Sequence, residues 1–218
     1  GPGNQYVSTA KMLVYGEVDI DMPAGPSELM VIADAGARCE WVAADLLSQL
    51  EHGEDSQVIL IAFEEEFAEA VVAEMLGQMC SLQRLEIIEK SFAKSFIIVV
   101  ESMDQACFLA NEYAPEHLEI VVGKPKSVLS NIVNVGSVFL GPYASEPLGD
   151  YVTGANHTLP TSGFAKMFGP LASDSFGKMI QVQELTCDGL KNLAKSVQVM
   201  AEKEGLDAHG RAVAIRLE

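Results

Sequence analysis

The stretch Asn111-Glu-Tyr-Ala-Pro-Glu-His-Leu118 marks the point where a helical pattern ends and an apolar strand pattern begins. Pro115 separates the two, because proline lacks the N–H that a helix interior needs and pushes the preceding Ala114 towards extended geometry. Glu116 and His117 are therefore expected at a fixed corner at the edge of a strand. A carboxylate beside an imidazole can activate water and relay a proton near neutral pH. On this stretch alone, a turn-capping Glu116 and a solvated His117 are the favoured alternative.

On either side of this corner, short apolar runs alternate with amphipathic segments of helical spacing. Continuous apolar runs of this length are typical of parallel strands that are buried on both faces. The expected strands are 29–33, 58–62, 96–100, 118–122 and 137–140, and the expected helices are 40–50, 65–79, 103–110 and 127–133. Strands separated by helices require right-handed crossovers. The sequence therefore predicts an α/β fold, a mostly parallel sheet flanked by helices (incomplete Rossmann-like), with a C-terminal helical arm.

Glycine and proline divide the chain into three predicted parts. Residues 1–24 hold a helical pattern and a short strand at 18–20, which is too little to own a core, and we interpret them as the remnant of a preceding domain. Residues 25–170 are the predicted α/β core domain. Their last segment, 142–170, is rich in glycine and proline, and a loop of this length in a compact domain is usually functional.

Residues 171–218 are the predicted helical arm. The chain is expected to turn helical again from Ser173, with helices at 188–204 and 207–217 separated by Gly205. An arm that cannot bury its own apolar face usually packs on a partner. We therefore predict that it is a dimerisation arm, exchanged between the subunits of a homodimer.

Composition narrows the class of partner and the compartment. The net charge of −17 argues against nucleic acid and against an anionic membrane surface as partners. The longest apolar run has six residues, too few for a transmembrane helix, and no secretory signal opens the chain. The four cysteines are widely spaced and match no C-x-x-C pattern, which indicates reduced thiols and a cytoplasmic location.

The histidines all stand beside turns or at the ends of helical patterns. His52 ends a helix, and Gln49 lies three residues earlier on the same face. Asp150 and His157 fall in the glycine-rich loop, and His209 opens the last helix. Nitrogen and oxygen donors of this kind suit zinc, but the spacing matches no short zinc motif. For each histidine taken singly, a surface or capping role is favoured. No G-x-G-x-x-G fingerprint follows a strand, so the pattern gives no support to dinucleotide binding.

Taken together, the motifs resemble the histidinol dehydrogenase family. The matching segments run along the whole chain in family order, but they span only the C-terminal half of the family's chain. They are Gly1-Pro-Gly-Asn4, Asp21-Met-Pro-Ala-Gly-Pro-Ser-Glu28, Ala44-Asp-Leu-Leu-Ser-Gln-Leu-Glu-His-Gly53, Asp55-Ser-Gln57, Tyr113-Ala-Pro-Glu-His-Leu118, Gly136-Ser-Val-Phe-Leu-Gly-Pro142, Gly149-Asp-Tyr151, Asn156-His-Thr-Leu-Pro-Thr161, Val182-Gln-Glu-Leu-Thr186 and Gly205-Leu-Asp-Ala-His209.

The resemblance implies a zinc-dependent, NAD-linked oxidation of L-histidinol to L-histidine in two steps, in histidine biosynthesis. It implies Glu116 and His117 as the acid/base pair and Asn4 as a contact to NAD. The implied zinc ligands are Gln49, His52, Asp150 and His209. The implied substrate-binding residues are Ser27, Gln49, His52, His117, Asp150, His157, Glu204 and His209. In this family the tail that carries Glu204 and His209 comes from the partner subunit, in agreement with the predicted arm.

The sequence also departs from the family. The half that supplies most cofactor contacts is absent, and residues 1–24 would be what remains of that cofactor-side domain. Ser145-Glu-Pro-Leu148 replaces a common serine-rich run, Thr153 and Ala155 replace small polar residues, and Ser162-Gly-Phe164 replaces an aromatic-rich run. Two alternatives therefore remain open: a catalytically incomplete module that binds zinc and dimerises, or a homologue that oxidises another small amino or hydroxy alcohol.

Overall fold

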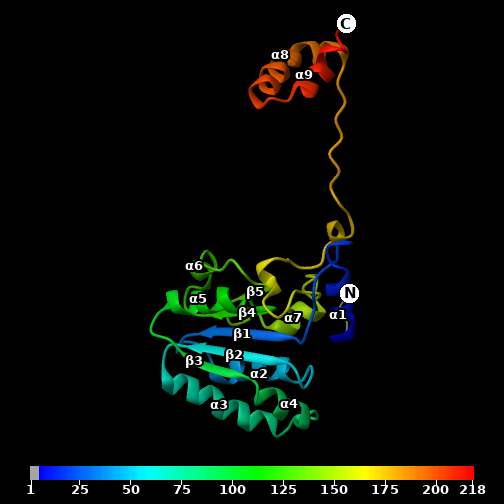
Figure 1. The fold of residues 1–218 in the computed structure, drawn as a ribbon. Helices are drawn as coiled ribbons and strands as arrows, with labels where there is room; N and C mark the ends of the chain where they lie inside the picture. Colours follow the sequence, from blue (N-terminus) through cyan, green and yellow to red (C-terminus); the bar gives the residue numbers. More distant parts are fainter. Residues whose placement is uncertain (1–4) are drawn as a thin grey trace. The chain divides into compact units, whose positions relative to one another are not determined.

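The computed structural model describes residues 5–218, and the chain forms two compact units, Gly1–Gly177 and Lys178–Glu218. The first unit is built on a five-stranded parallel sheet with the strand order β3-β2-β1-β4-β5 (Figure 1). The strands are β1 Glu28–Ala33, β2 Gln57–Ala62, β3 Phe96–Val99, β4 His117–Val121 and β5 Ser137–Leu140. The predicted α/β class is confirmed.

Helices cover both faces of this sheet (Figure 1). One face carries α2 Cys39–Leu50, α3 Glu65–Met79 and α4 Leu85–Phe92, and the other carries α5 Met103–Tyr113 and α6 Pro125–Leu129. The remaining elements of the first unit are α1 Gln5–Val14, α7 Glu146–Tyr151 and the 3-10 turns η1 Phe164–Lys166 and η2 Ser173–Phe176.

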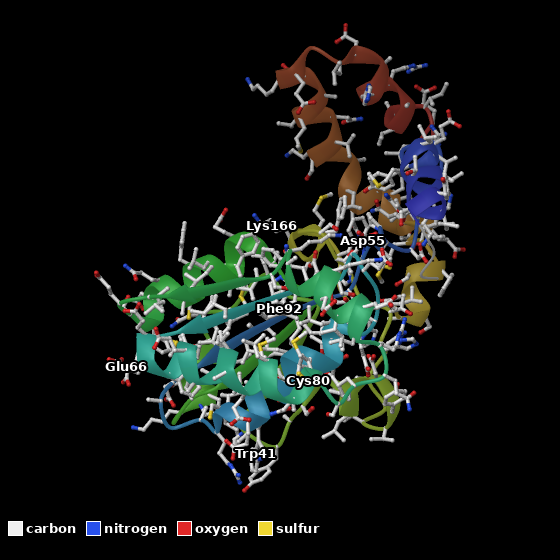
Figure 2. The ribbon with its side chains drawn as sticks, turned by 90° about the horizontal axis from the view of Figure 1, so that it is seen from below. Trp41, Asp55, Glu66, Cys80, Phe92 and Lys166 are labelled. Carbon is white, nitrogen blue, oxygen red and sulfur yellow. The ribbon has the colours of Figure 1, made fainter. Side chains whose placement is uncertain are left out.

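The continuous apolar strands are explained by their two buried faces. In β2, Leu60 packs into the cluster under α2 and α3, whereas its neighbour Ile61 packs into the cluster under α5. Side chains alternate between the faces of a strand, so a central strand needs apolar residues at every position. Charged side chains remain outside: Figure 2 shows Glu66, in the first turn of α3, at the periphery. Trp41 lies at the periphery as well, and its ring packs against Tyr143 and under the guanidinium of Arg38 (Figure 2).

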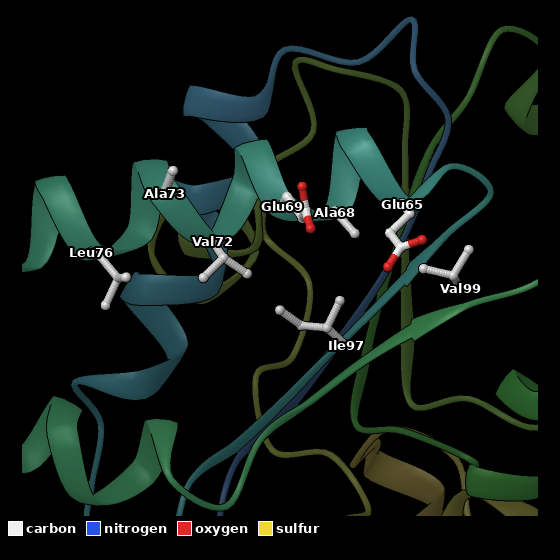
Figure 3. Close-up of a pocket in the computed structure, with 8 residues that line it drawn as sticks. All are labelled: Glu65, Ala68, Glu69, Val72, Ala73, Leu76, Ile97 and Val99. Carbon is white, nitrogen blue, oxygen red and sulfur yellow. The ribbon is translucent and has the colours of Figure 1, made fainter.

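At one edge of the sheet, β3 is only partly covered. Figure 3 shows Ile97 and Val99 beside Val72 and Leu76 of α3, around an open apolar hollow. Phe96 is 55% exposed. The buried core is therefore centred on β1, β2 and β4.

Two helices were not predicted. α4 lies in a segment that was left unassigned, and α7 lies inside the stretch that was predicted to be loop. Pro147 and Gly149 suggested a loop there, but proline is favoured in the first turn of a helix, where its missing N–H costs nothing.

Other predicted boundaries are wrong by small amounts. The expected strand at 18–20 is only an isolated bridge between Tyr15 and Val18, and the helix expected at 127–133 is the shorter α6. Helix does not resume from Ser173, where a single 3-10 turn is followed by non-helical chain up to Thr186.

The second unit consists of two helices, α8 Cys187–Glu204 and α9 Asp207–Ala214, which pack on each other. Gly205 joins them with φ of 70°, a left-handed conformation that glycine adopts without strain, and Leu206 N–H donates to Ala201 O at 2.8 Å. Only Ala194 and Ala201 of these helices are buried. In the described chain, no helix combines the length and the apolar character needed to cross a membrane.

Candidate active site

The candidate site lies at the edge of the sheet where the strands begin. Glu28 and His117 are the first residues of the neighbouring strands β1 and β4, and His52 follows the end of α2. Ligands of open α/β sheets usually bind at the opposite edge, at the carboxyl ends of the strands. The position of the site therefore does not follow from the fold class alone.

A tight corner carries Glu116 and His117 into the site. Ala114 closes α5 in the left-handed conformation, with φ of 56° and its N–H donating to Ala110 O at 2.8 Å. The prediction of an extended Ala114 is wrong, because the chain ends the helix and enters β4 within three residues. Gly136 N–H and Ser137 N–H donate to the carbonyls of Pro115 and Glu116. These hydrogen bonds hold the corner against the start of β5.

The approach at this corner is too close for a side chain on Gly136. A Cβ atom at that position would lie 2.5 Å from Glu116 O. Only glycine lets the two backbones meet at this distance. Gly136 therefore belongs to the structure that positions Glu116, although no chemistry falls to it.

Glu116 is a buried carboxyl group with one backbone donor. Its Oε2 accepts a hydrogen bond from Glu28 N–H at 3.0 Å, and the residue is 6% exposed. The pKa of Glu116 is raised to about 8, chiefly by burial and also by the nearby carboxyls of Glu28 and Asp150, against the lowering effect of the N–H donor. A carboxyl with a pKa close to neutrality can both take and give a proton.

His117 is a buried imidazole that burial keeps neutral. Its Nδ1 lies 3.2 Å from Glu28 O, so Nδ1–H donates to this carbonyl and Nε2 is left as the acceptor. Burial lowers the pKa of His117 to about 4. The alternative of a turn-capping Glu116 and a solvated His117 is wrong, because both side chains are buried beside each other, with His117 Nδ1 3.8 Å from Glu116 Oε2.

His52 and Asp150 meet across the mouth of the site. His52 Nε2 lies 3.6 Å from Asp150 Oδ2, and His52 Nδ1 lies 3.0 Å from Ser48 O on the preceding turn. A carbonyl at Nδ1 orients the ring and leaves Nε2 for a metal. Asp150 was predicted in a loop, but it lies on α7, which brings it to His52 from a separate part of the chain.

Glu146 was missed by the sequence reasoning. It lies one helical turn before Asp150, and its carboxylate is within 4.8 Å of the ligand atoms of His52 and Asp150. Burial raises the pKa of Glu146 to about 8. A glutamate four residues before a predicted aspartate ligand was the available signal, but it required recognising α7 as a helix.

Four other predicted site residues are Gln49, Glu204, His209 and Asn4. Gln49 is fully buried on the last turn of α2, and neither atom of its amide is hydrogen-bonded to a described residue. Glu204 and His209 lie in the second unit, on α8 and α9. Asn4 lies outside the described residues. The roles of all four remain predictions, as do the catalytic and ligand roles of the other predicted site residues.

Six of the predicted site residues converge on one cavity of about 330 Å³. A histidine, a carboxylate, a hydroxyl and the Glu116–His117 pair all face this space. The predicted residues that line it are Ser27, His52, Glu116, His117, Asp150 and His157. Residues far apart in the sequence thus line a single cavity that contains both metal-type donors and an acid/base pair.

A family model for histidinol dehydrogenase matches residues 1–217. The chain belongs to the histidinol dehydrogenase family. It is 48% identical over 221 residues to a histidinol dehydrogenase from Vibrio vulnificus and 50% identical over 219 residues to one from Bacteroides fragilis. In both comparisons the match covers 100% of this chain and 51% of the relative.

A solved structure agrees with the sequence relatives. The crystal structure of histidinol dehydrogenase from Elizabethkingia anophelis superposes with a TM-score of 0.92 at 45% identity, covering 100% of this chain and 50% of that one. The chain therefore spans about half the length of the histidinol dehydrogenases that it matches. The resemblance predicted from the motifs is confirmed at the level of the family and of the fold.

Proposed function

We propose that this chain carries the metal-binding and acid/base side of a zinc-dependent, NAD-linked histidinol dehydrogenase, which oxidises L-histidinol to L-histidine in two steps of histidine biosynthesis. The observation that supports this most directly is the shared cavity. His52 and Asp150 line it together with Glu116 and His117. A metal-type donor pair beside a buried acid/base pair can serve the oxidation of an alcohol, because a bound metal polarises the oxygen and the base takes its proton.

The donor set fits zinc. His52 supplies an imidazole nitrogen and Asp150 a carboxylate oxygen, both donors that zinc accepts. The buried amide of Gln49 has no hydrogen-bond partner among the described residues, as expected of a group whose partner is a bound ligand or metal. In the proposal Gln49 and His209 complete the protein ligands. When bound, zinc would polarise and orient the substrate oxygen.

Two proton acceptors serve the two oxidations. Each oxidation removes a hydride from carbon and a proton from oxygen: first from the alcohol, and then from the hydrate of the aldehyde. Nε2 of the neutral His117 can accept the alcohol proton, since its Nδ1–H is directed at Glu28 O. The Glu116 carboxylate, with a pKa of about 8, can take a proton from the water that adds to the aldehyde.

Substrate recognition is assigned to the rim of the same cavity and to the tail. Ser27 and His157 line the cavity and would contact the amine and hydroxyl of L-histidinol. Glu204 and His209 would reach the site from the partner subunit of a homodimer with exchanged tails. Free thiols at all four cysteines agree with the expected cytoplasmic setting.

The nicotinamide cofactor enters this proposal only through the family. Asn4 is the single contact that the resemblance implies, and the chain contains no glycine-rich dinucleotide fingerprint. The residues of this chain therefore do not by themselves fit NAD, which as the proposed acceptor of both hydrides would depend on contacts from outside this chain.

A second function is favoured by the length of the chain. The chain spans about half of its relatives, and we propose as the second function that these residues taken alone would bind zinc and dimerise but would need the other half of the enzyme for turnover. A homologue with another small amino or hydroxy alcohol as its substrate would show the same metal site but would oxidise that alcohol faster than L-histidinol.

The proposal is tested by His52→Asn, with His157→Asn as the matched control. We expect elemental analysis to show loss of zinc in His52→Asn and retained zinc in His157→Asn, because only His52 is assigned to the metal. Combined with the missing half of a relative, the parent chain should form NADH from L-histidinol, and His52→Asn should not. Equal zinc in the parent and in His52→Asn would remove the metal assignment.

A further inference from the structure

Glu146 is the most deeply buried charged side chain of the site, and the mechanism above does not use it. It is 0% exposed, and neither of its carboxylate oxygens is hydrogen-bonded to a residue that the structure describes. Buried polar groups in folded proteins nearly always have a partner. An unpartnered carboxylate in this position therefore needs an explanation.

The backbone at Glu146 is held in place, so the side chain cannot leave the site by a small movement of α7. Glu146 N–H donates to Glu119 Oε1 at 2.8 Å, and Ser145 Oγ donates to Asp45 Oδ1 at 2.7 Å. A Cβ atom on Gly149 would lie 2.7 Å from the ring of Phe139, which shows how closely α7 packs on the sheet.

Among the residues that the structure describes, no cationic side chain compensates Glu146. Among the described residues, the only basic group within ion-pair distance is His117, whose Nε2 lies 4.0 Å from Glu146 Oε1 and which burial keeps neutral. Protonation would remove the charge, but the buried O–H would then have to share the neighbouring carboxylate of Asp150, which is itself a proposed metal ligand. An isolated buried carboxyl is costly in either form.

The metal-type donors next to Glu146 suggest what the missing partner of its carboxylate is. The ligand atoms of His52, Glu146 and Asp150 all lie within 4.8 Å of one another, a spacing that one cation can span. Glu146 is thus close both to His52 and Asp150 and to Nε2 of His117. A divalent cation at this point would supply the missing partner for the carboxylate, as hard and borderline cations prefer oxygen and imidazole donors.

We infer that Glu146 is the buried negative charge of the cation site: its carboxylate faces the same divalent cation as His52 and Asp150 and increases the affinity of the site for it. This inference rests on the proposed function, which already assigns His52 and Asp150 to zinc. It adds a buried residue that lies within 4.8 Å of the ligand atoms of His52 and Asp150 and 4.0 Å from Nε2 of His117.

The test is the affinity of the whole chain for Zn²⁺ alone, measured by competition with a chromophoric chelator. Glu146→Gln should weaken zinc binding by about 10- to 100-fold, the usual effect of removing a group that supports a metal. Glu146→Asp keeps the charge and should recover part of the affinity. Glu66→Gln, an exposed glutamate on α3, is the matched control and should bind as the parent does.

A second measurement separates this role from a purely structural one. Without zinc, Glu146→Gln should have a thermal unfolding midpoint equal to or above that of the parent, because an amide is less costly to bury than an unpaired carboxylate. A lower midpoint together with weak binding that Glu146→Asp does not recover would overturn the inference in favour of a structural role. Parent-like affinity in Glu146→Gln, with zinc lost in His52→Asn, would also overturn it and leave the proposed function standing. Parent-like affinity in both variants would remove the zinc proposal itself.

Discussion

In the first unit, β1 is buried at every position and β2 at all but its first, whereas in the second unit α8 and α9 together bury only Ala194 and Ala201. The two regions have different sources of order. The first unit has an apolar cluster on each face of its sheet. The second has a capped helix pair that is held by Thr186, which accepts from Gly189 N–H at 3.1 Å, and by the turn at Gly205.

The tail leaves its large apolar side chains exposed within its own unit. Those on α8 are Leu193 at 50%, Val197 at 37%, Val199 at 48% and Met200 at 62% exposure. Leu193, Val197 and Met200 are spaced four and three residues apart and share one face of α8, and exposed apolar side chains gathered on one face are typical of an interaction surface. The first unit is therefore stabilised by its own core. The second unit leaves an apolar helix face exposed, as the proposed exchange of this segment between subunits requires.

The largest expected difference between the two units is in the unfolding free energy lost when one leucine of each unit is truncated to alanine. Leu60→Ala removes a side chain that is 1% exposed and should cost about 2–5 kcal/mol of unfolding free energy. Leu193→Ala, at 50% exposure, should cost less than about 1 kcal/mol. Hydrogen exchange resolved by segment measures both. A similar loss of unfolding free energy in the two units would contradict the view that only the first unit is stabilised by a buried core.

A second effect concerns the carboxyls that only the first unit buries. Burial raises the pKa of Glu28 to about 7, so the folded state keeps a proton that the unfolded state loses above about pH 4.5. Stability from this group is complete below pH 4.5 and is lost as the pH rises to about 7, by up to about 3 kcal/mol.

Glu28→Gln should therefore flatten the fall in stability between pH 5 and pH 8, measured by urea unfolding. Glutamine keeps the oxygen that accepts from Ser162 N–H at 2.9 Å. Glu202→Gln, exposed on α8, is the control and should retain the parent's pH dependence. An unchanged slope in Glu28→Gln would show that the buried carboxyl does not behave as its environment indicates.

The smallest effect on stability is expected from the tail surface. Replacing Val197 and Met200 by serine removes apolar area that the unit does not bury, so the unfolding free energy of the first unit should change by less than about 0.5 kcal/mol. The dimer fraction in analytical ultracentrifugation should fall, because the exposed row is what a partner would cover. A dimer fraction equal to the parent's would contradict the exchanged tail.

The predicted fold was accurate where one physical signal dominated. The runs at 58–62 and 137–140 were recognised as strands because a strand buried on both faces is apolar throughout, and α3 was predicted with its observed ends. α7 was missed because Pro147 and Gly149 are also common in loops, so the local sequence did not distinguish a loop from a short helix. Ala114 was misjudged because the tertiary demand to enter β4 outweighs the local preference before proline.

For the site, the sequence alone was enough to identify the candidate metal and proton donors and acceptors: His117 beside Glu116, His52 at the end of a helical pattern, and Asp150 on a distant segment. It also determined the family, through motifs that run along the whole chain. Only the tertiary structure decided that these groups share one cavity at the edge where the strands begin, and that Glu146 is buried among them without a partner. The physical reason is that charge, burial and the pKa of a side chain depend on neighbours brought together by packing, which no local pattern of residues contains.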